Sequence, residues 1–261
     1  MRFALPIVTL TTDFGYRDGY VGAMKGVVLS LAPTATLVDV THGVPPQDVA
    51  AGAVALAQAA ALFPAGTIHV AVVDPGVGGA RADLLVESGG QLFIGPDNGV
   101  LSLATRPDRR IFRVEAPAFR REPVSPTFHG RDVFAPTAGR LAAGARADEA
   151  GPAIGEMVEL GRPAISRHGA HVEGRVIHVD AFGNLITSLG AEHLSVESSV
   201  EVEGTGGVYH PVLARTFSDV ASGALVAYLG SGGQIEIARR DGSAAAHVGA
   251  ERGSIVRVGG A

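Results

Sequence analysis

The stretch from Thr67 to Arg81, TIHVAVVDPGVGGAR, constrains the fold more than any other part of the chain. Its first half, Ile68 to Val73, is a run of β-branched and apolar residues, which predicts a strand buried on both faces. Pro75 and Gly76 end regular structure directly after Asp74. A carboxylate and a glycine-rich turn therefore follow a buried strand, which is where ligands bind in open α/β sheets.

The patterns on either side of this strand predict an α/β N-terminal domain with a mainly parallel sheet. Strand and helix patterns alternate before it, and such crossovers favour parallel pairing. After it the sequence predicts a short strand pair across Gly89 and Gly90, a helix beginning near Val100, a further strand and a last helix. The expected segments are 7–11, 18–31, 36–40, 48–62, 84–87, 91–94, 110–114 and 133–143.

A change of pattern predicts a second domain. Helical periodicity is lost after Ala143, and Gly, Pro and Arg interrupt residues 151–167. We therefore expect an α/β domain over 1–160 and a smaller, all-β, barrel-like domain over 170–261. The second domain is expected to hold short strands over 171–179, 185–189, 199–203, 224–229, 234–238 and 254–258.

Composition narrows the classes of function. The net charge is −5 without a basic cluster, which argues against a nucleic-acid partner. The chain has no cysteine, so neither a disulfide framework nor a thiolate nucleophile is available. No apolar run approaches the roughly 20 residues of a membrane span, and Pro6 and Asp13 interrupt any leader-like start. These features predict a soluble, cytoplasmic protein without a membrane partner.

Three polar side chains in glycine-flanked loops are candidates for catalysis: Asp74, Arg81 and His129. A carboxylate orients a histidine and makes it more basic, and an arginine holds the carboxylate ionised. Together they can polarise a water. The alternative for each residue is structural: a loop-capping Asp74, a surface ion pair at Arg81, and a His129 that only begins a helix.

Asp13 and Asp180 are two further acids at predicted strand ends. A carboxylate can bind both hydroxyls of a ribose or pair with an ammonium group. Phe182 and Asn184 add an aromatic face and an amide to the Asp180 loop, which suit a purine base, although an Asx turn in a hairpin is the alternative. Walker, GxGxxG and GxSxG motifs are absent, and no histidines have metal-ligand spacing with an acid between them, so we expect no metal.

Several motifs together resemble one family over nearly the whole chain. These motifs are, in chain order, TTDFG, DVTHGV, IHVAVVDPGVGGAR, GPDNG, TFHGRDVFAP, HVDAFGN and LGSGGQIEIARRDGSAA. With them the chain resembles the S-adenosyl-L-methionine (SAM) hydrolases that form adenosine, also called SAM hydroxide adenosyltransferases, which are related to the fluorinases and chlorinases.

The resemblance implies an α/β domain and a β-barrel domain in a homotrimer, with SAM bound between subunits. It implies that Asp74, Arg81 and His129 are catalytic, that Asp13 binds the ribose and that Asp180 binds the methionine amine. The residues implied to bind substrate are Asp13, Thr127, Phe128, Asp180, Phe182, Asn184, Ser231, Glu236 and Arg239.

Two departures from the related halogenases bear on the reaction. Gly232 stands where the fluorinase has an arginine, and Gly130 replaces a serine that holds fluoride there. With His129 present, the second change favours water over halide as the nucleophile. The expected products are adenosine and methionine, without a cofactor. The alternatives are halide-dependent adenosyl transfer and a non-catalytic SAM- or adenosine-binding protein.

Overall fold

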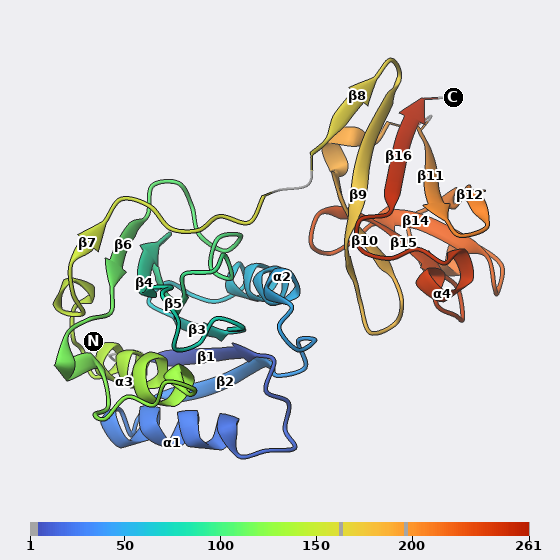
Figure 1. The fold of residues 1–261 in the computed structure, drawn as a ribbon. Helices are drawn as coiled ribbons and strands as arrows, with labels where there is room; N and C mark the ends of the chain where they lie inside the picture. Colours follow the sequence, from blue (N-terminus) through green and yellow to red (C-terminus); the bar gives the residue numbers. More distant parts are fainter. Residues whose placement is uncertain (1–4, 162–163, 196–197, 261) are drawn as a thin grey trace. The chain divides into compact units, whose positions relative to one another are not determined.

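The computed structural model describes residues 5–161, 164–195 and 198–260, and the chain divides into two compact units, Met1–Leu160 and Gly161–Ala261 (Figure 1). The N-terminal unit alternates strands and helices as predicted up to its third strand. Its elements are β1 Ile7–Thr12, α1 Tyr20–Leu31, β2 Thr36–Thr41, α2 Val49–Ala60, β3 Ile68–Val72, β4 Asp83–Ser88, β5 Gln91–Pro96, β6 Arg110–Arg113, α3 Ala135–Ala142 and β7 Ala153–Ile154.

The sheet of this unit is mixed, which corrects the expectation of a mainly parallel sheet. Its strand order is β2-β1-β3-β5-β4-β6-β7. The β2–β1, β1–β3 and β3–β5 pairs are parallel, whereas β5–β4, β4–β6 and β6–β7 are antiparallel. The parallel half follows from the helical crossovers, and the antiparallel half begins at the tight β4–β5 hairpin, whose turn uses Gly89 and Gly90 at positive φ.

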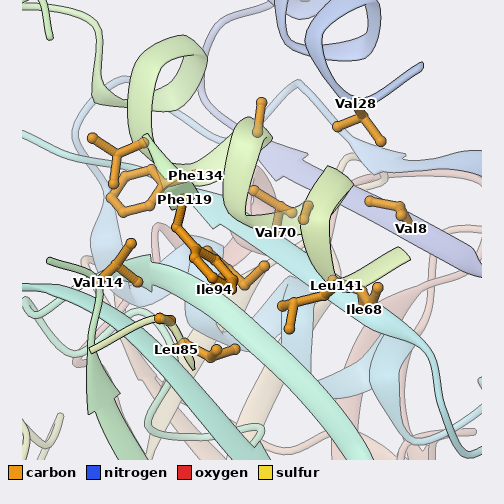
Figure 2. Close-up of a cluster of buried hydrophobic side chains, with 14 of the residues drawn as sticks. Val8, Val28, Ile68, Val70, Leu85, Ile94, Val114, Phe119, Phe134 and Leu141 are labelled. Atoms are coloured by element: carbon orange, nitrogen blue, oxygen red, sulfur yellow. The ribbon is translucent and has the colours of Figure 1, made fainter. Parts of the chain in front are cut away.

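The central strand β3 is buried on both faces, as its apolar run predicts. Its alternate side chains enter two different hydrophobic clusters. Ile68, Val70 and Val72 pack with residues of α1 and α3, as Figure 2 shows for Ile68 and Val70. Ala71 lies in the cluster that α2 covers on the opposite face. Because helices cover both faces of the sheet, a ligand can reach it at the carboxyl ends of its parallel strands.

Two local expectations need correction. No helix begins near Val100, although the side chain of Asn98 accepts a hydrogen bond from the Val100 N–H at 3.1 Å. The N–H groups of Ser102 and Ala104 bond to carbonyls three residues back, so this segment forms consecutive turns instead. The predicted helix over 133–143 is α3, preceded by a π-helical turn over Gly130–Phe134. Pro136 cannot donate to the Asp132 carbonyl, which accepts from the Arg121 N–H at 2.8 Å. The missing donor explains why the helix is irregular there.

The C-terminal unit is strand-rich but not wholly β. Its elements are β8 Ser166–His168, β9 His171–Val179, β10 Leu185–Gly190, β11 Ser198–Gly204, β12 Gly207–Tyr209, β13 Val212–Leu213, β14 Leu225–Leu229, β15 Gln234–Arg239, α4 Ala244–Val248 and β16 Ile255–Gly260. The hydrogen-bonded path runs β12-β11-β16-β9-β10-β15-β14-β13, with β8 beside β9. The path has two ends among the described residues, so it is a curled open sheet and not a closed barrel.

Short 3₁₀ turns complete the two units, at Pro117–Phe119, Ala147–Glu149, Ala191–His193 and Phe217–Asp219. Among the helices of the described residues, none has the length and apolar character that crossing a bilayer requires.

Candidate active site

Asp74 and Arg81 form a buried ion pair at the end of β3. The Arg81 Nε donates to Asp74 Oδ1 at 3.0 Å, and its Nη2 contacts Asp74 Oδ2. The two side chains are 10% and 4% exposed, which excludes the alternative of a surface ion pair. Burial alone would lower the pKa of Arg81, but its hydrogen bonds to Asp74 and Asp83 outweigh burial and raise it.

His129 joins this pair from a loop that is distant in sequence. Its Nδ1 lies 3.1 Å from Arg81 Nη2, so the structure brings all three predicted catalytic side chains together. His129 directly precedes the π-helical turn, and the ring of Phe134 from that turn lies 5.6 Å from the Arg81 guanidinium carbon. The apolar ring backs the guanidinium and keeps water from one side of it.

Sequence reasoning missed a fourth member, Asp83, at the start of β4. One of its carboxylate oxygens, Oδ1, contacts Arg81 Nη1 and lies 3.1 Å from His129 Nδ1. The other, Oδ2, lies 3.3 Å from Nη2 of Arg120, whose Nε donates to the Val114 carbonyl at 2.9 Å. The only signal in the sequence was an acid two residues after Arg81, at the start of an apolar run.

Asp13 follows β1, the parallel neighbour of β3, so its loop and the Asp74 loop leave the same edge of the sheet. Its Oδ2 accepts from the Gln47 N–H at 2.8 Å. Gln47 is one of two non-glycine residues described with positive φ, at 65°. Asp13 therefore has a structural partner at Oδ2, whereas no hydrogen bond from the described part of the chain reaches its Oδ1.

A series of contacts between polar groups connects the loop that follows Asp13 to buried side chains of the N-terminal unit. The Phe14 N–H donates to Thr12 Oγ1 at 3.2 Å, and this hydroxyl lies 2.8 Å from His42 Nδ1. The other ring nitrogen of His42 lies 3.0 Å from Asp39 Oδ1, although the two are not aligned for a hydrogen bond. Burial opposes ionisation of Asp39, but its hydrogen bonds from Lys25 and Tyr16 and the nearby His42 ring outweigh burial and lower its pKa to about 2.

Aromatic rings connect the loop of Asp13 to the loop of His129. The Phe128 ring lies 6.0 Å from Phe14 and 5.2 Å from Tyr20, in edge-to-face geometry. Thr127, next to Phe128, is exposed, and its hydroxyl lies 3.3 Å from Ser125 Oγ. The predicted residues of the N-terminal unit thus border one edge of the sheet.

In the C-terminal unit, the Asp180 loop connects β9 to β10. Asp180 Oδ1 accepts from the N–H groups of Phe182 and Asn184 at 2.9 and 2.8 Å, and Oδ2 accepts from Asn184 Nδ2 at 2.8 Å. This is the Asx turn that the sequence left open. It presents the Phe182 ring, which is 80% exposed. Gly183 has a φ of 81° and packs against Ser243, the N-cap of α4.

The remaining predicted residues lie on or beside β15. Ser231 is exposed in the turn before it. Glu236 pairs across the sheet with Ile186 of β10 and accepts from the Tyr228 hydroxyl at 2.9 Å. Arg239 donates from Nε to the Gly223 carbonyl at 2.9 Å. Because Leu185 also pairs with Ile237, Glu236 and Arg239 lie in the part of β15 that is next to Asn184, whereas Ser231 precedes the other end of this strand.

Each of the two units matches one domain of the same protein family. Residues 8–151 match the SAM hydroxide adenosyltransferase N-terminal domain, and residues 174–257 match the C-terminal domain of the same family. An (R)-S-adenosyl-L-methionine hydrolase from Salinispora arenicola is 42% identical over 97% of each chain, and a fluorinase from Nocardia brasiliensis is 29% identical over 92% of each.

A solved structure shares the fold. The crystal structure of an uncharacterized conserved protein from Thermotoga maritima is 30% identical, with a TM-score of 0.89 over 97% of this chain and 99% of that one. The family match covers both units, and the hydrolase match extends over nearly the full length. The chain belongs to the SAM hydroxide adenosyltransferase family.

Proposed function

We propose that this protein hydrolyses SAM to adenosine and L-methionine. The observation that carries the proposal is the buried cluster in which Arg81 is held by Asp74 and lies 3.1 Å from His129. A histidine held beside an ion pair, at the end of a buried strand, is the arrangement that general-base activation of water requires. The 42% identity to a protein named as an (R)-S-adenosyl-L-methionine hydrolase supports the same conclusion.

The chemistry of SAM matches what this cluster offers. The leaving group is a neutral thioether, so it requires neither a general acid nor a metal, and we propose that no cofactor takes part. Water is a weak nucleophile at neutral pH and requires a base. In the proposed step, His129 accepts a proton from water as the oxygen bonds to C5′, and the electrons of the breaking C5′–S bond move to sulfur.

Substrate contacts come from both units in this proposal. Asp13 accepts hydrogen bonds from the ribose hydroxyls, and Asp180 binds the methionine ammonium. Asp180 already accepts three hydrogen bonds from its own loop. A carboxylate has about four acceptor positions, so it retains one for the ammonium. The other proposed substrate-binding residues are Thr127, Phe128, Phe182, Asn184, Ser231, Glu236 and Arg239.

We propose that the protein is a homotrimer. In this assembly each SAM site lies between two subunits and takes residues from both. We place the protein in the cytoplasm, where SAM is made and used. The exposed Phe182 ring supports a shared site, because a large aromatic ring that is 80% exposed is suited to stacking on a base supplied from outside its own unit.

The packing around Gly130 favours water over halide. A β-carbon at Gly130 would lie 3.2 Å from Met24 Sδ and 3.3 Å from the Phe128 ring, which is tighter than ordinary contact. A serine such as the halide-binding residue of the fluorinases therefore does not fit without movement of these neighbours. Halide-dependent adenosyl transfer remains the alternative reaction to be tested.

The test is incubation of the purified protein with each sulfonium epimer of SAM in water labelled with heavy oxygen, with and without chloride or fluoride. We expect adenosine that carries the label on C5′, an unchanged rate with halide, and faster turnover of the R epimer, given the name of the relative. A halogenated nucleoside would establish the alternative chemistry. Tight binding of SAM without any product would establish a binding protein.

A further inference from the structure

Asp83 is a buried acid that contacts two of the proposed catalytic side chains, Arg81 and His129, and that the proposed reaction leaves without a role. We propose that Asp83 is a positioning residue that keeps the proton of neutral His129 on Nδ1, so that Nε2 is free to accept a proton from water. The inference rests on the proposed hydrolysis, but its first test below does not depend on turnover.

The proton on Nδ1 is decided by its two neighbours. Arg81 Nη2 and Asp83 Oδ1 both lie 3.1 Å from His129 Nδ1. A guanidinium can only donate, so Arg81 favours an unprotonated Nδ1. A carboxylate can only accept, so Asp83 favours a protonated Nδ1. The two residues thus compete for opposite tautomers of the same ring.

The charge distribution favours Asp83 in this competition. Arg81 already directs Nε and Nη2 at Asp74, and its Nη1 contacts Asp83. Nη1 also reaches the Ala82 carbonyl at 3.4 Å, so four of the five N–H groups of Arg81 have acceptors without His129, and only the second N–H of Nη2 faces Nδ1. An unprotonated Nδ1 would instead direct its lone pair at the Asp83 carboxylate, which is repulsive. A bond from Nδ1–H to Asp83 is charge-assisted and removes that repulsion.

Asp83 is fixed in the orientation that this role needs. Arg81 engages Oδ1 and Arg120 approaches Oδ2 at 3.3 Å, so the carboxylate cannot rotate away from His129 without breaking an ion pair. Arg120 is itself anchored on the Val114 carbonyl. After proton transfer, the carboxylate also lies against the imidazolium and stabilises its charge.

Asp83 is reachable by a small ion, which makes it testable by chemical rescue. The residues that line one surface pocket include Arg81, Asp83, Arg113, Glu115 and Arg120. The side chains of Arg113 and Glu115 are about half exposed, so the pocket opens to solvent. Formate can therefore replace the carboxylate of Asp83 in an Asp83→Ala variant.

The first test is nuclear magnetic resonance of the imidazole nitrogens in protein labelled at histidine, with His129 assigned by loss of its signal in His129→Gln. We expect neutral His129 to carry its proton on Nδ1 in the wild type. In Asp83→Ala, where only the guanidinium of Arg81 faces Nδ1, the proton should move to Nε2, and formate should return it. A wild-type proton on Nε2 would overturn the proposal even if the variant does not fold.

The second test is kinetic. Asp83→Ala should lower kcat by about 10²-fold, the scale of one positioned acid–base group, with KM for SAM changed less than threefold. Formate should restore part of kcat. Glu115→Gln, which alters the same pocket without touching His129, should retain wild-type turnover. Wild-type turnover in Asp83→Ala, or a loss of activity with Nδ1 still protonated, would leave Asp83 only structural. A wild-type protein inactive on both SAM epimers would refute the proposed hydrolysis instead.

Discussion

The backbone of Gly78 lies directly against the carbonyl oxygen of Pro126: a β-carbon at Gly78 would be 2.1 Å from that atom. Gly78 belongs to the turn between Asp74 and Arg81, and Pro126 begins the loop that leads to His129. The φ of Gly78 is 73°, which other residues rarely adopt. This contact therefore sets how closely the Arg81 turn and the His129 loop approach each other.

Gly78→Ala should separate these loops and disrupt the Arg81–His129 contact. We expect turnover to fall at least tenfold and the free energy of unfolding to fall by about 1–3 kcal/mol, the scale of local backbone strain. Steady-state kinetics and urea unfolding measure the two effects. Gly66→Ala is the matched control, because Gly66 has a φ of 83° but nothing within 4 Å of its would-be β-carbon. It should lose stability and keep its activity.

The sequence predicted those features of the fold and the site that depend on residues close together in the chain. Asp74 was recognisable because a buried strand ends before it, and the β4–β5 hairpin because two glycines separate two apolar runs. Asp83 was not, because its partners Arg81, His129 and Arg120 meet only through folding. The other antiparallel pairs of the sheet, β4–β6 and β6–β7, were missed for the same reason, since pairing between β4 and β6 leaves no mark on either strand alone.

Arg81 should tolerate no other cation. It contacts Asp74 through two nitrogens and Asp83 through a third, and the single ammonium of a lysine cannot reproduce this fork. We expect Arg81→Lys and His129→Ala each to lower kcat by about 10²-fold, with KM for SAM changed only a few fold. Because the residues act as a unit, the double variant should be hardly slower than either single one. Additive losses would show that they act independently.

Asp13 should contribute to substrate binding and to loop structure in separable ways. Asp13→Asn retains an oxygen that can accept from the Gln47 N–H but loses the negative charge. We expect adenosine binding to weaken by about 2 kcal/mol, roughly thirtyfold, with little change in stability. Asp13→Ala should bind as poorly and also be less stable, because the Gln47 N–H loses its partner. Calorimetric titration with adenosine checks the first effect, and thermal unfolding checks the second.

A histidine outside the site should dominate the response of stability to mild acid. His69 lies in β3, fully buried, with its ring stacked on Phe93 at 5.0 Å. Its Nδ1 lies 2.7 Å from Thr9 Oγ1, but no partner within the described residues reaches its Nε2. Burial lowers its pKa from 6.5 to about 4, because the charged ring would have no water around it.

The protein should therefore lose stability as the pH falls from 6.5 to about 4, where the unfolded chain binds a proton at His69 and the folded chain does not. The loss from this group should approach about 3 kcal/mol and stop below that range. Asp39, with a pKa lowered from 3.8 to about 2, acts only at lower pH, so the two contributions are separable. Urea unfolding of His69→Gln across this range should show a flatter dependence, whatever its stability at neutral pH. The exposed His210→Gln should retain the wild-type slope, and a wild-type slope in His69→Gln would mean that another group is responsible.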